Sequence, residues 1–213
     1  MTAPQRRLNE ASRRKPRLTK TERRQQLLAH AKQLFVQFGY RDTTTEKIAA
    51  AAGVTEPVLY RHFDSKKTLF LEVLQEIREA TLGRWNAETA SLSDPLAKLH
   101  AVMDRYLGAA REHALEFRVM HRTLVESDDE EIVALLRSFY LDSEALLAQI
   151  IGEGQQTGVF RRSLDPRVGA WELIRTALGY TLTLPLGAPL YAEPDYLPRA
   201  IECLLHCLLK TDV

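Results

Sequence analysis

The sequence predicts an all-α protein of about nine helices, in which a small N-terminal helix-turn-helix domain precedes a larger helical domain. Three observations lead to this prediction. Nearly every segment carries apolar residues at helical spacing, two short segments before residue 65 are separated by a glycine turn, and the charged residues are unevenly distributed. The 213 residues are enough to bury a sizeable core.

The net charge of +1 hides a difference between the two ends of the chain. Residues 1–70 hold fifteen Lys and Arg against six Asp and Glu, a net charge of +9, and the remaining residues carry a net charge of −8. This pattern favours a module that binds a polyanion, joined to a module with another task. A solvated basic helix face would give the same counts, so charge alone leaves both interpretations open.

The sequence also indicates the cellular compartment in which we expect the protein. No apolar run reaches the roughly 18 residues of a transmembrane helix, and the arginine-rich N-terminus lacks the apolar region of a secretory signal. The two cysteines, Cys203 and Cys207, lie four residues apart and cannot staple a fold. We therefore expect a cytoplasmic protein that has no contact with a membrane.

The first helix is expected in the segment LTKTERRQQLLAHAKQLFVQFG. Thr19 and Glu22 match a capping box, an apolar stripe follows at helical spacing, and Gly39 can end the helix. The next segment, TTTEKIAAAAG, offers Thr43 or Thr44 as its N-terminal cap.

The third helix, TEPVLYRHF, begins with Thr55 as N-cap and has Pro57 in its first turn. Only about three residues separate it from the second helix, which forces the large crossing angle of a helix-turn-helix. Leu59 and Phe63 should face inward, because they lie four residues apart, while Tyr60 and Arg61 are left on the outer face. Ile48 and Val54 are expected to complete this small core.

Six further helices are expected in the rest of the chain. The fourth begins at Asp64 or Ser65, and Asp94-Pro95 and Asp165-Pro166 are further helix starts in which a cap precedes a proline. A loop with four prolines is expected over residues 184–198. The predicted helices run from 65 to the high 80s, and over 95–112, 114–125, 129–153, 166–184 and 195–210.

The stretch TTTEKIAAAAGVTEPVLYRHFDSKKTLF resembles the DNA-binding domain of the TetR/AcrR family of bacterial transcriptional regulators. The resemblance covers roughly residues 20–75, and its order of Thr, Ile-Ala, Ala-Gly-Val, Leu-Tyr-x-His-Phe and Ser-Lys is specific. It implies a recognition helix that enters the major groove, while neighbouring groups hold the phosphates. The DNA-binding positions that it implies are Thr44, Thr45, Thr55, Glu56, Pro57, Tyr60, Arg61, His62 and Lys66.

Several of these positions have a second interpretation. Tyr60 and Lys66 match phosphate-contacting positions of the family. Pro57 departs from the family pattern, because many relatives carry glycine at this position. Glu56 could accept a hydrogen bond from cytosine, or it could only favour the helix N-terminus. His62 is a base-reading candidate by position, and a packing or capping histidine is the alternative.

The resemblance and the composition together predict three parts of the chain. Residues 1–17 form a basic arm that tracks phosphates or enters a minor groove, unless it is only a solubilising tail. Residues 18–64 form the DNA-binding domain. Residues 65–213 form an effector-binding and dimerisation domain, whose last two helices pair with those of a second copy.

A ligand pocket is expected among the middle helices. The candidate residues are mostly apolar and aromatic, which favours a hydrophobic effector, although each of them could be plain core. They are Met103, Tyr106, Phe117, Met120, His121, Tyr140, Trp171 and Arg175. Arg118, His121, Arg122 and Arg175 could neutralise an acidic ligand, but surface exposure explains them equally well.

The predicted function is a ligand-responsive repressor that binds a palindromic double-stranded DNA operator as a homodimer. We find no phosphate-cradling glycine loop and no hydrolase or protease motif, so we expect neither an enzyme nor a cofactor. An architectural DNA-binding protein without an effector is the alternative, and an enzyme is the more remote one. Two spacings could hold a metal, although packing explains them equally well: Cys203 with His206 and Cys207, and His100 with Asp104.

Overall fold

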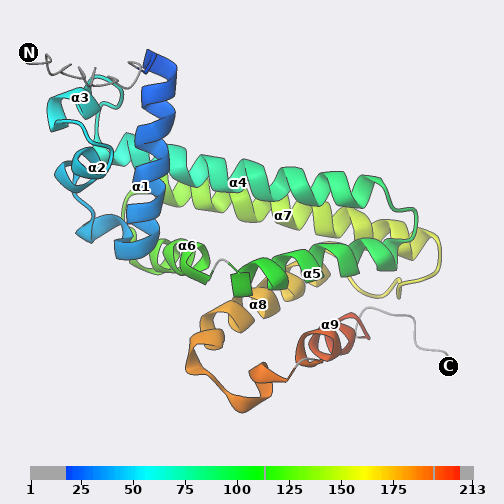
Figure 1. Ribbon diagram of the computed structural model, residues 1–213. Coiled ribbons are helices and arrows are strands. Elements are labelled where there is room, and N and C mark those ends of the chain that lie inside the picture. Colours follow the sequence, from blue (N-terminus) through cyan, green and yellow to red (C-terminus); the bar gives the residue numbers. More distant parts are fainter. Residues whose placement is uncertain (1–17, 113, 194, 207–213) are drawn as a thin grey trace, which may run out of the picture.

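The computed structural model contains nine α-helices and no strand of a sheet over the residues that it describes, which are 18–112, 114–193 and 195–206. The first three helices stand at one end of the long helix α4, which runs beside α7 (Figure 1). Two short 3₁₀ turns, η1 and η2, lie between the last two helices. The elements are α1 (Lys20–Asp42), α2 (Thr45–Ala51), α3 (Glu56–Tyr60), α4 (Lys66–Ala90), α5 (Pro95–Glu112), α6 (Ala114–Glu126), α7 (Glu130–Gln156), α8 (Pro166–Thr183), η1 (Leu184–Leu186), η2 (Pro189–Ala192) and α9 (Tyr196–His206).

Side-chain hydrogen bonds fix the starts of the N-terminal helices. The predicted capping box is confirmed, because the Glu22 N–H donates to the Thr19 hydroxyl at 3.2 Å and the Thr19 N–H donates to the Glu22 carboxylate at 2.7 Å. Thr44, and not Thr43, caps α2. Ser65 caps α4, and Thr55 occupies the cap position of α3 without making the side-chain bond.

The first helix changes direction near its end. Gly39 adopts a φ of 80°, a conformation that favours glycine, and one more helical turn then leads to Asp42. The buried Thr43 hydroxyl donates to the carbonyls of Leu34 at 3.1 Å and of Gly39 at 2.7 Å. The regular part of α1 thus stops where the sequence predicted, and Thr43 satisfies two carbonyls at the bend.

The small core of the first three helices forms as predicted. Leu59 is 0% exposed and Phe63 is 2% exposed, and Ile48 is also fully buried. Val54, the fourth predicted member, is only half-buried. The guanidinium of Arg24 lies 4.6 Å from the centre of the Phe63 ring, so the basic side chain covers the edge of this core.

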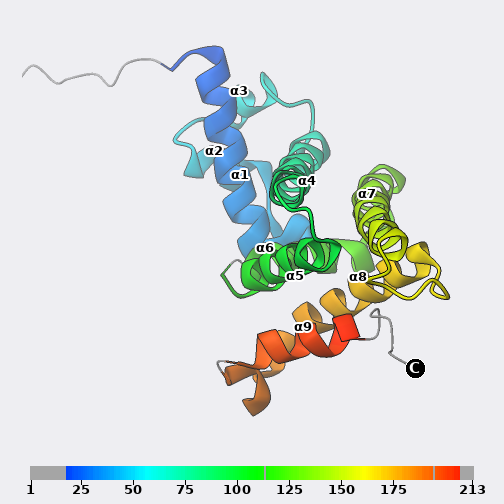
Figure 2. The same cartoon turned by 90° about the vertical axis from the view of Figure 1, so that its right-hand side faces the viewer.

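The remaining helices form a bundle on which the first three stand. α4, α5 and α7 lie side by side, α8 packs along α7, and α6 lies beneath α1 (Figures 1 and 2). The carboxylates of Asp94 and Asp165 accept from the first-turn N–H groups of α5 and α8, which confirms both predicted helix starts. α1 packs against both α4 and α6, so two helices of the bundle hold the N-terminal helices.

The C-terminal region differs from the prediction in detail. α7 continues to Gln156, beyond the predicted end at residue 153. The predicted proline-rich loop contains the two 3₁₀ turns, and the Tyr191 ring in this segment packs against Tyr180 and Tyr196 at centroid distances of 5.7 and 5.1 Å. α9 is described as far as His206, so its predicted end at residue 210 lies outside the described residues.

Gly154 allows α7 to pack against the turn that follows it, which leads to a prediction of stability. A Cβ atom at this position would overlap with the ring of Phe160, which is only 1% exposed. We expect Gly154→Ala to lower the free energy of unfolding by about 1–3 kcal/mol, because the ring must leave its packed position. Urea unfolding followed by circular dichroism measures the change.

Gly152 is the matched control, because a Cβ atom there has no neighbour within 4 Å. Gly152→Ala should raise the free energy of unfolding by about 0.5–1 kcal/mol through helix propensity alone. Equal effects of the two substitutions would show that the contact with Phe160 does not limit this position.

Candidate DNA-binding surface and ligand pocket

The outer face of the helix-turn-helix presents polar groups to solvent. Thr55, Pro57, Tyr60 and Arg61 are exposed, and Tyr60 has an exposed fraction of 48%. The opposite face of the same five-residue helix carries the buried Leu59. These four of the residues predicted to contact DNA are therefore accessible to solvent.

A hydrogen-bonded cluster joins this face of α3 to the start of α2. The Thr45 hydroxyl donates to the Glu56 carboxylate and lies 3.3 Å from the Tyr60 hydroxyl. Glu56 is half-buried, and this bond fixes the direction of its carboxylate. Base reading by Glu56 stays a prediction, with the cluster as its structural alternative. Thr44 is exposed beside the cluster, at the N-terminus of α2.

His62 lies at the edge of the domain core. Burial lowers the pKa of its imidazole, and Lys20 and Arg24 lower it further. Its Nδ1 atom is buried and has no hydrogen-bond partner within the described part of the chain. The neutral, half-buried ring agrees with the packing alternative for this residue.

Lys66 is directed at the end of α1 in this structure. Its ammonium group donates to the carbonyls of Tyr40 at 2.9 Å and of Thr43 at 3.0 Å, and it lies 4.5 Å from the centre of the Tyr40 ring. Burial lowers the pKa of the ammonium. These contacts supply a structural role for Lys66, beside the phosphate contact that the family resemblance implies. The predicted basic arm, residues 1–17, lies outside the described residues.

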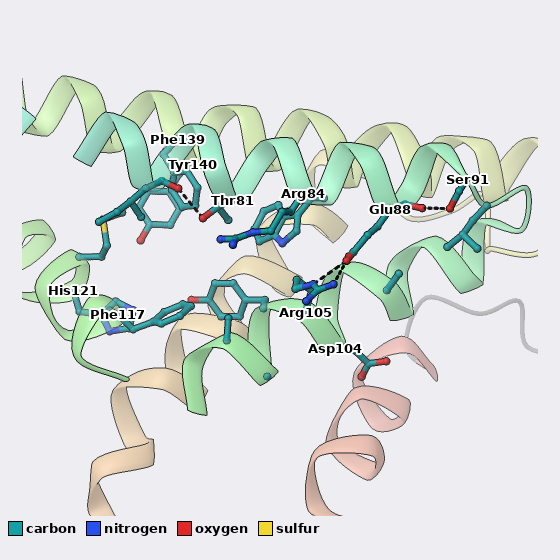
Figure 3. Close-up of a pocket in the computed structure, with 18 residues that line it drawn as sticks. Thr81, Arg84, Glu88, Ser91, Asp104, Arg105, Phe117, His121, Phe139 and Tyr140 are labelled. Atoms are coloured by element: carbon teal, nitrogen blue, oxygen red, sulfur yellow. Dashed lines mark hydrogen bonds and ion pairs between the residues drawn. The ribbon is translucent and has the colours of Figure 1, made fainter. Parts of the chain in front are cut away.

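A pocket of about 650 Å³ lies between α4, α5, α6 and α7 (Figure 3). This volume is in the range of binding sites for small organic molecules. Its wall is largely apolar and aromatic, with a few charged groups. The lining residues are Ile77, Thr81, Arg84, Trp85, Glu88, Ser91, Leu92, Ala101, Asp104, Arg105, Tyr106, Gly108, Ala109, Phe117, Met120, His121, Phe139 and Tyr140.

The structure brings together most of the predicted ligand-binding residues. Those that line the pocket are Tyr106, Phe117, Met120, His121 and Tyr140.

Three other candidates lie elsewhere. Met103 borders a separate void of about 30 Å³. The Trp171 indole donates to the Glu144 carboxylate at 2.8 Å, and Arg175 is exposed and paired with Glu172 on α8. None of these three lines the large pocket.

Sequence reasoning placed one end of the fourth helix at the pocket but named none of the lining residues that α4 supplies. Ile77, Thr81, Arg84, Trp85 and Glu88 recur at intervals of three or four residues, so they share one side of the helix. This spacing is visible in the sequence, but it predicts a helix face without saying what the face meets. The position of α5 opposite α4 turns that face into a pocket wall (Figure 3).

The aromatic end of the pocket is uncharged near neutral pH. Burial raises the pKa of Tyr140 to about 12 and also raises that of Tyr106. Burial lowers the pKa of His121, whose Nε2 atom lies 3.0 Å from the Thr181 hydroxyl. The two phenols and the imidazole therefore offer neutral hydrogen-bonding groups to a ligand.

Among the described residues, no cluster of three or more potential metal ligands occurs. The His100 Nε2 atom lies 3.5 Å from the Glu202 carboxylate, while Asp104 lines the pocket. Cys203 and His206 are exposed on α9, and Cys207 lies outside the described residues. None of the described helices is long and apolar enough to cross a membrane.

Several apolar residues of α8 and of the described part of α9 are covered within the chain. Ile174, Tyr180, Ile201 and Leu205 are all buried. Within the described residues, α8 packs against α7 and α5, and α9 packs against α5. The accessible face of α8 is mixed, with apolar Val168 and Leu182 among polar residues.

This chain resembles known proteins in two respects, the sequence of its N-terminal domain and its fold. Residues 27–73 match the family model described as bacterial regulatory proteins, tetR family. The nucleoid occlusion factor SlmA of Alteromonas mediterranea is 30% identical over 65% of this chain and 71% of its own length. The HTH-type transcriptional repressor KstR2 of Rhodococcus jostii is 29% identical over 73% of this chain and 80% of its own. The match to the HTH-type transcriptional activator FasR of Mycolicibacterium smegmatis is 34% identical and spans only 51% of this chain and 50% of FasR.

Two solved structures illustrate the likeness in fold. SmeT, the repressor of the Stenotrophomonas maltophilia efflux pump SmeDEF, superimposes with a TM-score of 0.73 at 21% identity, over 88% of this chain and 90% of SmeT. FadR of Bacillus subtilis, in complex with stearoyl-CoA, gives a TM-score of 0.71 at 18% identity, over 89% of this chain and 99% of FadR.

The contacts of Lys66 lead to a prediction that separates its structural role from a phosphate contact. Lys66→Met should lower the free energy of unfolding by about 1–3 kcal/mol, because the buried carbonyls of Tyr40 and Thr43 lose their donor. Thermal and urea unfolding without DNA measure this effect. Lys20→Met, at an exposed position on α1, is the control and should change stability by less than about 0.5 kcal/mol. Unchanged stability of Lys66→Met, together with weaker DNA binding, would contradict the structural role.

Proposed function

The chain belongs to the TetR family of bacterial transcriptional regulators, and we propose that it is a homodimeric repressor that binds a palindromic operator and is released by a largely hydrophobic effector. The proposed parts are the basic arm over 1–17, the DNA-binding domain over 18–64 and the effector-binding and dimerisation domain over 65–213. The observation that carries the proposal is the 650 Å³ pocket, which is lined by α4 and α6, the two bundle helices that pack against α1.

DNA binding is assigned to the exposed face of α3 and the N-terminus of α2. Tyr60 and the helix N-terminus at Thr44 would hold phosphates, while Thr55, Pro57 and Arg61 would approach the base edges. A dimer through α8 and α9 would present two recognition helices to successive major grooves, about 34–36 Å apart. The twofold symmetry of such a dimer fits a palindromic operator.

The packing supports a route from the pocket to the DNA-binding domain. Met120 and His121 of α6 line the pocket, while the adjacent Arg122 approaches Gly39 and lies 3.9 Å from the carboxylate of Asp42 at the end of α1. α4 lines the pocket with its middle turns, and Lys66 at its start holds the same end of α1. A ligand that prefers another spacing of α4 and α6 would turn α1 and, with it, α3.

Such a coupling is reciprocal. The effector weakens operator binding by its differential affinity for the two arrangements, and the operator weakens effector binding by the same factor, typically about 1–3 kcal/mol. The names of KstR2 and SmeT support repression, while that of FasR makes activation the alternative. Transcription from the bound promoter, measured with and without the protein, distinguishes the two.

The first test concerns the operator. The DNA next to the gene is searched for inverted repeats, and the purified protein is footprinted on each of them. We expect protection of one short palindrome. Uniform binding along unrelated DNA would instead favour an architectural role, and turnover of a small molecule in the pocket would favour an enzyme.

A substitution at Tyr60 tests the docking on DNA. Tyr60→Phe should weaken binding to the operator and to unrelated DNA by a similar amount, about 1 kcal/mol, because a phosphate contact carries no sequence information. Fluorescence anisotropy at several salt concentrations gives both affinities. Tyr191→Phe, which removes a hydroxyl from η2, is the matched control and should bind DNA as the wild type does. Unchanged binding of Tyr60→Phe to both DNAs would refute the proposed orientation of α3.

A substitution that fills the pocket tests the switch. Ala109 lines the pocket on α5, so Ala109→Trp should remove the response to an effector while operator affinity without effector stays within about 0.5 kcal/mol of the wild type. Compounds are first selected by thermal shift, and operator is then titrated with and without each one. Ala134→Trp, at an exposed position on α7, is the control and should keep the response. A full response in Ala109→Trp would place the effector site elsewhere.

A further inference from the structure

The pocket contains two arginines in different electrostatic situations. Arg105 of α5 donates to the Glu88 carboxylate through its Nε atom at 2.9 Å and also through Nη2, so the two charges compensate each other. Arg84 of α4 forms no ion pair and no hydrogen bond with any residue in the described part of the chain. Figure 3 shows its guanidinium turned into the pocket, between Tyr140 and Arg105.

Among the described residues that line the pocket, no acidic side chain offers an unpaired charge to a cationic ligand as Arg84 does to an anionic one. Glu88 is occupied by Arg105. Asp104 also lines the pocket, but Figure 3 shows its carboxylate on the side of α5 that faces α9, away from Arg84. Burial lowers the pKa of His121 and keeps the imidazole neutral, so it adds no charge at the aromatic end. The charge that a ligand meets inside the pocket is therefore that of Arg84.

The rest of the wall favours a long apolar group. Trp85, Tyr106, Phe117 and Tyr140 surround the space, each from a different helix. The rings of Tyr106 and Phe117 pack edge to face with their centroids 5.1 Å apart. The lining residues of α4 extend over several turns, from Ile77 to Glu88, and Ser91 and Leu92 follow just after the helix, so the pocket runs along the helix axis. Its shape fits an extended molecule better than a round one.

We propose that the pocket binds an anionic amphiphile, in which Arg84 holds a carboxylate headgroup and the aromatic wall surrounds an aliphatic tail. This inference rests on the proposed role of the pocket as an effector site, and it names the chemical class of the effector. The guanidinium offers paired donors that match both oxygens of a carboxylate. Arg84 is exposed to water while the pocket is empty, so its charge carries little desolvation cost in the fold. A tail that displaces the water strengthens the ion pair by lowering the local dielectric constant.

Three probes that share one tail test the proposal: decanoate, decanol and decyltrimethylammonium. Their binding to the wild-type homodimer is measured by isothermal titration calorimetry below their micelle concentrations. We expect decanoate to bind at least about tenfold more tightly than decanol, the factor that about 1.4 kcal/mol of a charge-assisted hydrogen bond provides. Arg84→Gln should remove this preference while decanol binds as before. Arg137→Gln, at an exposed arginine of α7 that does not line the pocket, is the matched control and should keep it.

The possible outcomes separate this inference from the proposed function. Equal binding of decanoate and decanol, tighter binding of decyltrimethylammonium, no binding of decanoate, or an unchanged preference in Arg84→Gln would each overturn the assignment of Arg84. Operator affinity is measured in parallel with each probe. If decanoate binds in an Arg84-dependent manner and the operator stays bound, the headgroup assignment stands and the proposed release mechanism fails. The unfolding midpoints of both variants confirm that each is folded.

Discussion

The C-terminal end of α1 connects the N-terminal helices to the bundle. The carbonyl groups at this helix end lack partners within the helix, and side chains from other segments supply the donors. Thr43 donates to two of these carbonyls from the following segment, and Lys66 donates to two others from the start of α4. Arg122 of α6 lies against Gly39, at the bend itself. Groups from three different segments thus meet at one helix end, and a shift of any of them changes the hydrogen bonding of the others.

This joint explains how a pocket in the bundle can influence a helix that contacts DNA. A flexible linker would let the bundle helices shift without moving α1. Hydrogen bonds between α4 and the end of α1 would instead couple a shift of α4 to a shift of α1. The helices that reach the joint, α4 and α6, are also two walls of the pocket. In the proposed mechanism, the N-terminal helices would follow these walls, with α3 held to α2 by its packing and with Leu59 and Phe63 buried in their common core.

Local sequence patterns predicted the helices, their caps and the outer face of α3, because these depend on neighbours within a few residues. The pocket was only partly predictable. Thr81, Arg84 and Glu88 have the spacing and polarity of an ordinary solvated helix face, and only the placement of α5 makes them lining residues. Trp171, which was chosen for its aromatic ring, lies outside the large pocket, and its indole N–H donates to Glu144. The sequence gives the chemical type of each side chain, but the group that the side chain contacts depends on the tertiary packing.

α7, one of the two other walls of the pocket, packs tightly against its neighbours. α7 closes on the turn around Phe160 through Gly154, and the nearly buried Glu144 joins α7 to α8. Hydrogen bonds from Arg167 and Trp171 hold the pKa of Glu144 below its ordinary value, so this carboxylate stays charged and paired at neutral pH. In the proposed dimer, α8 also faces the second copy, so the fixed walls of both pockets would belong to one central body. Movements of α4 and α6 against that body would then change the distance between the two copies of α3, which is the quantity that an operator with a fixed half-site spacing selects.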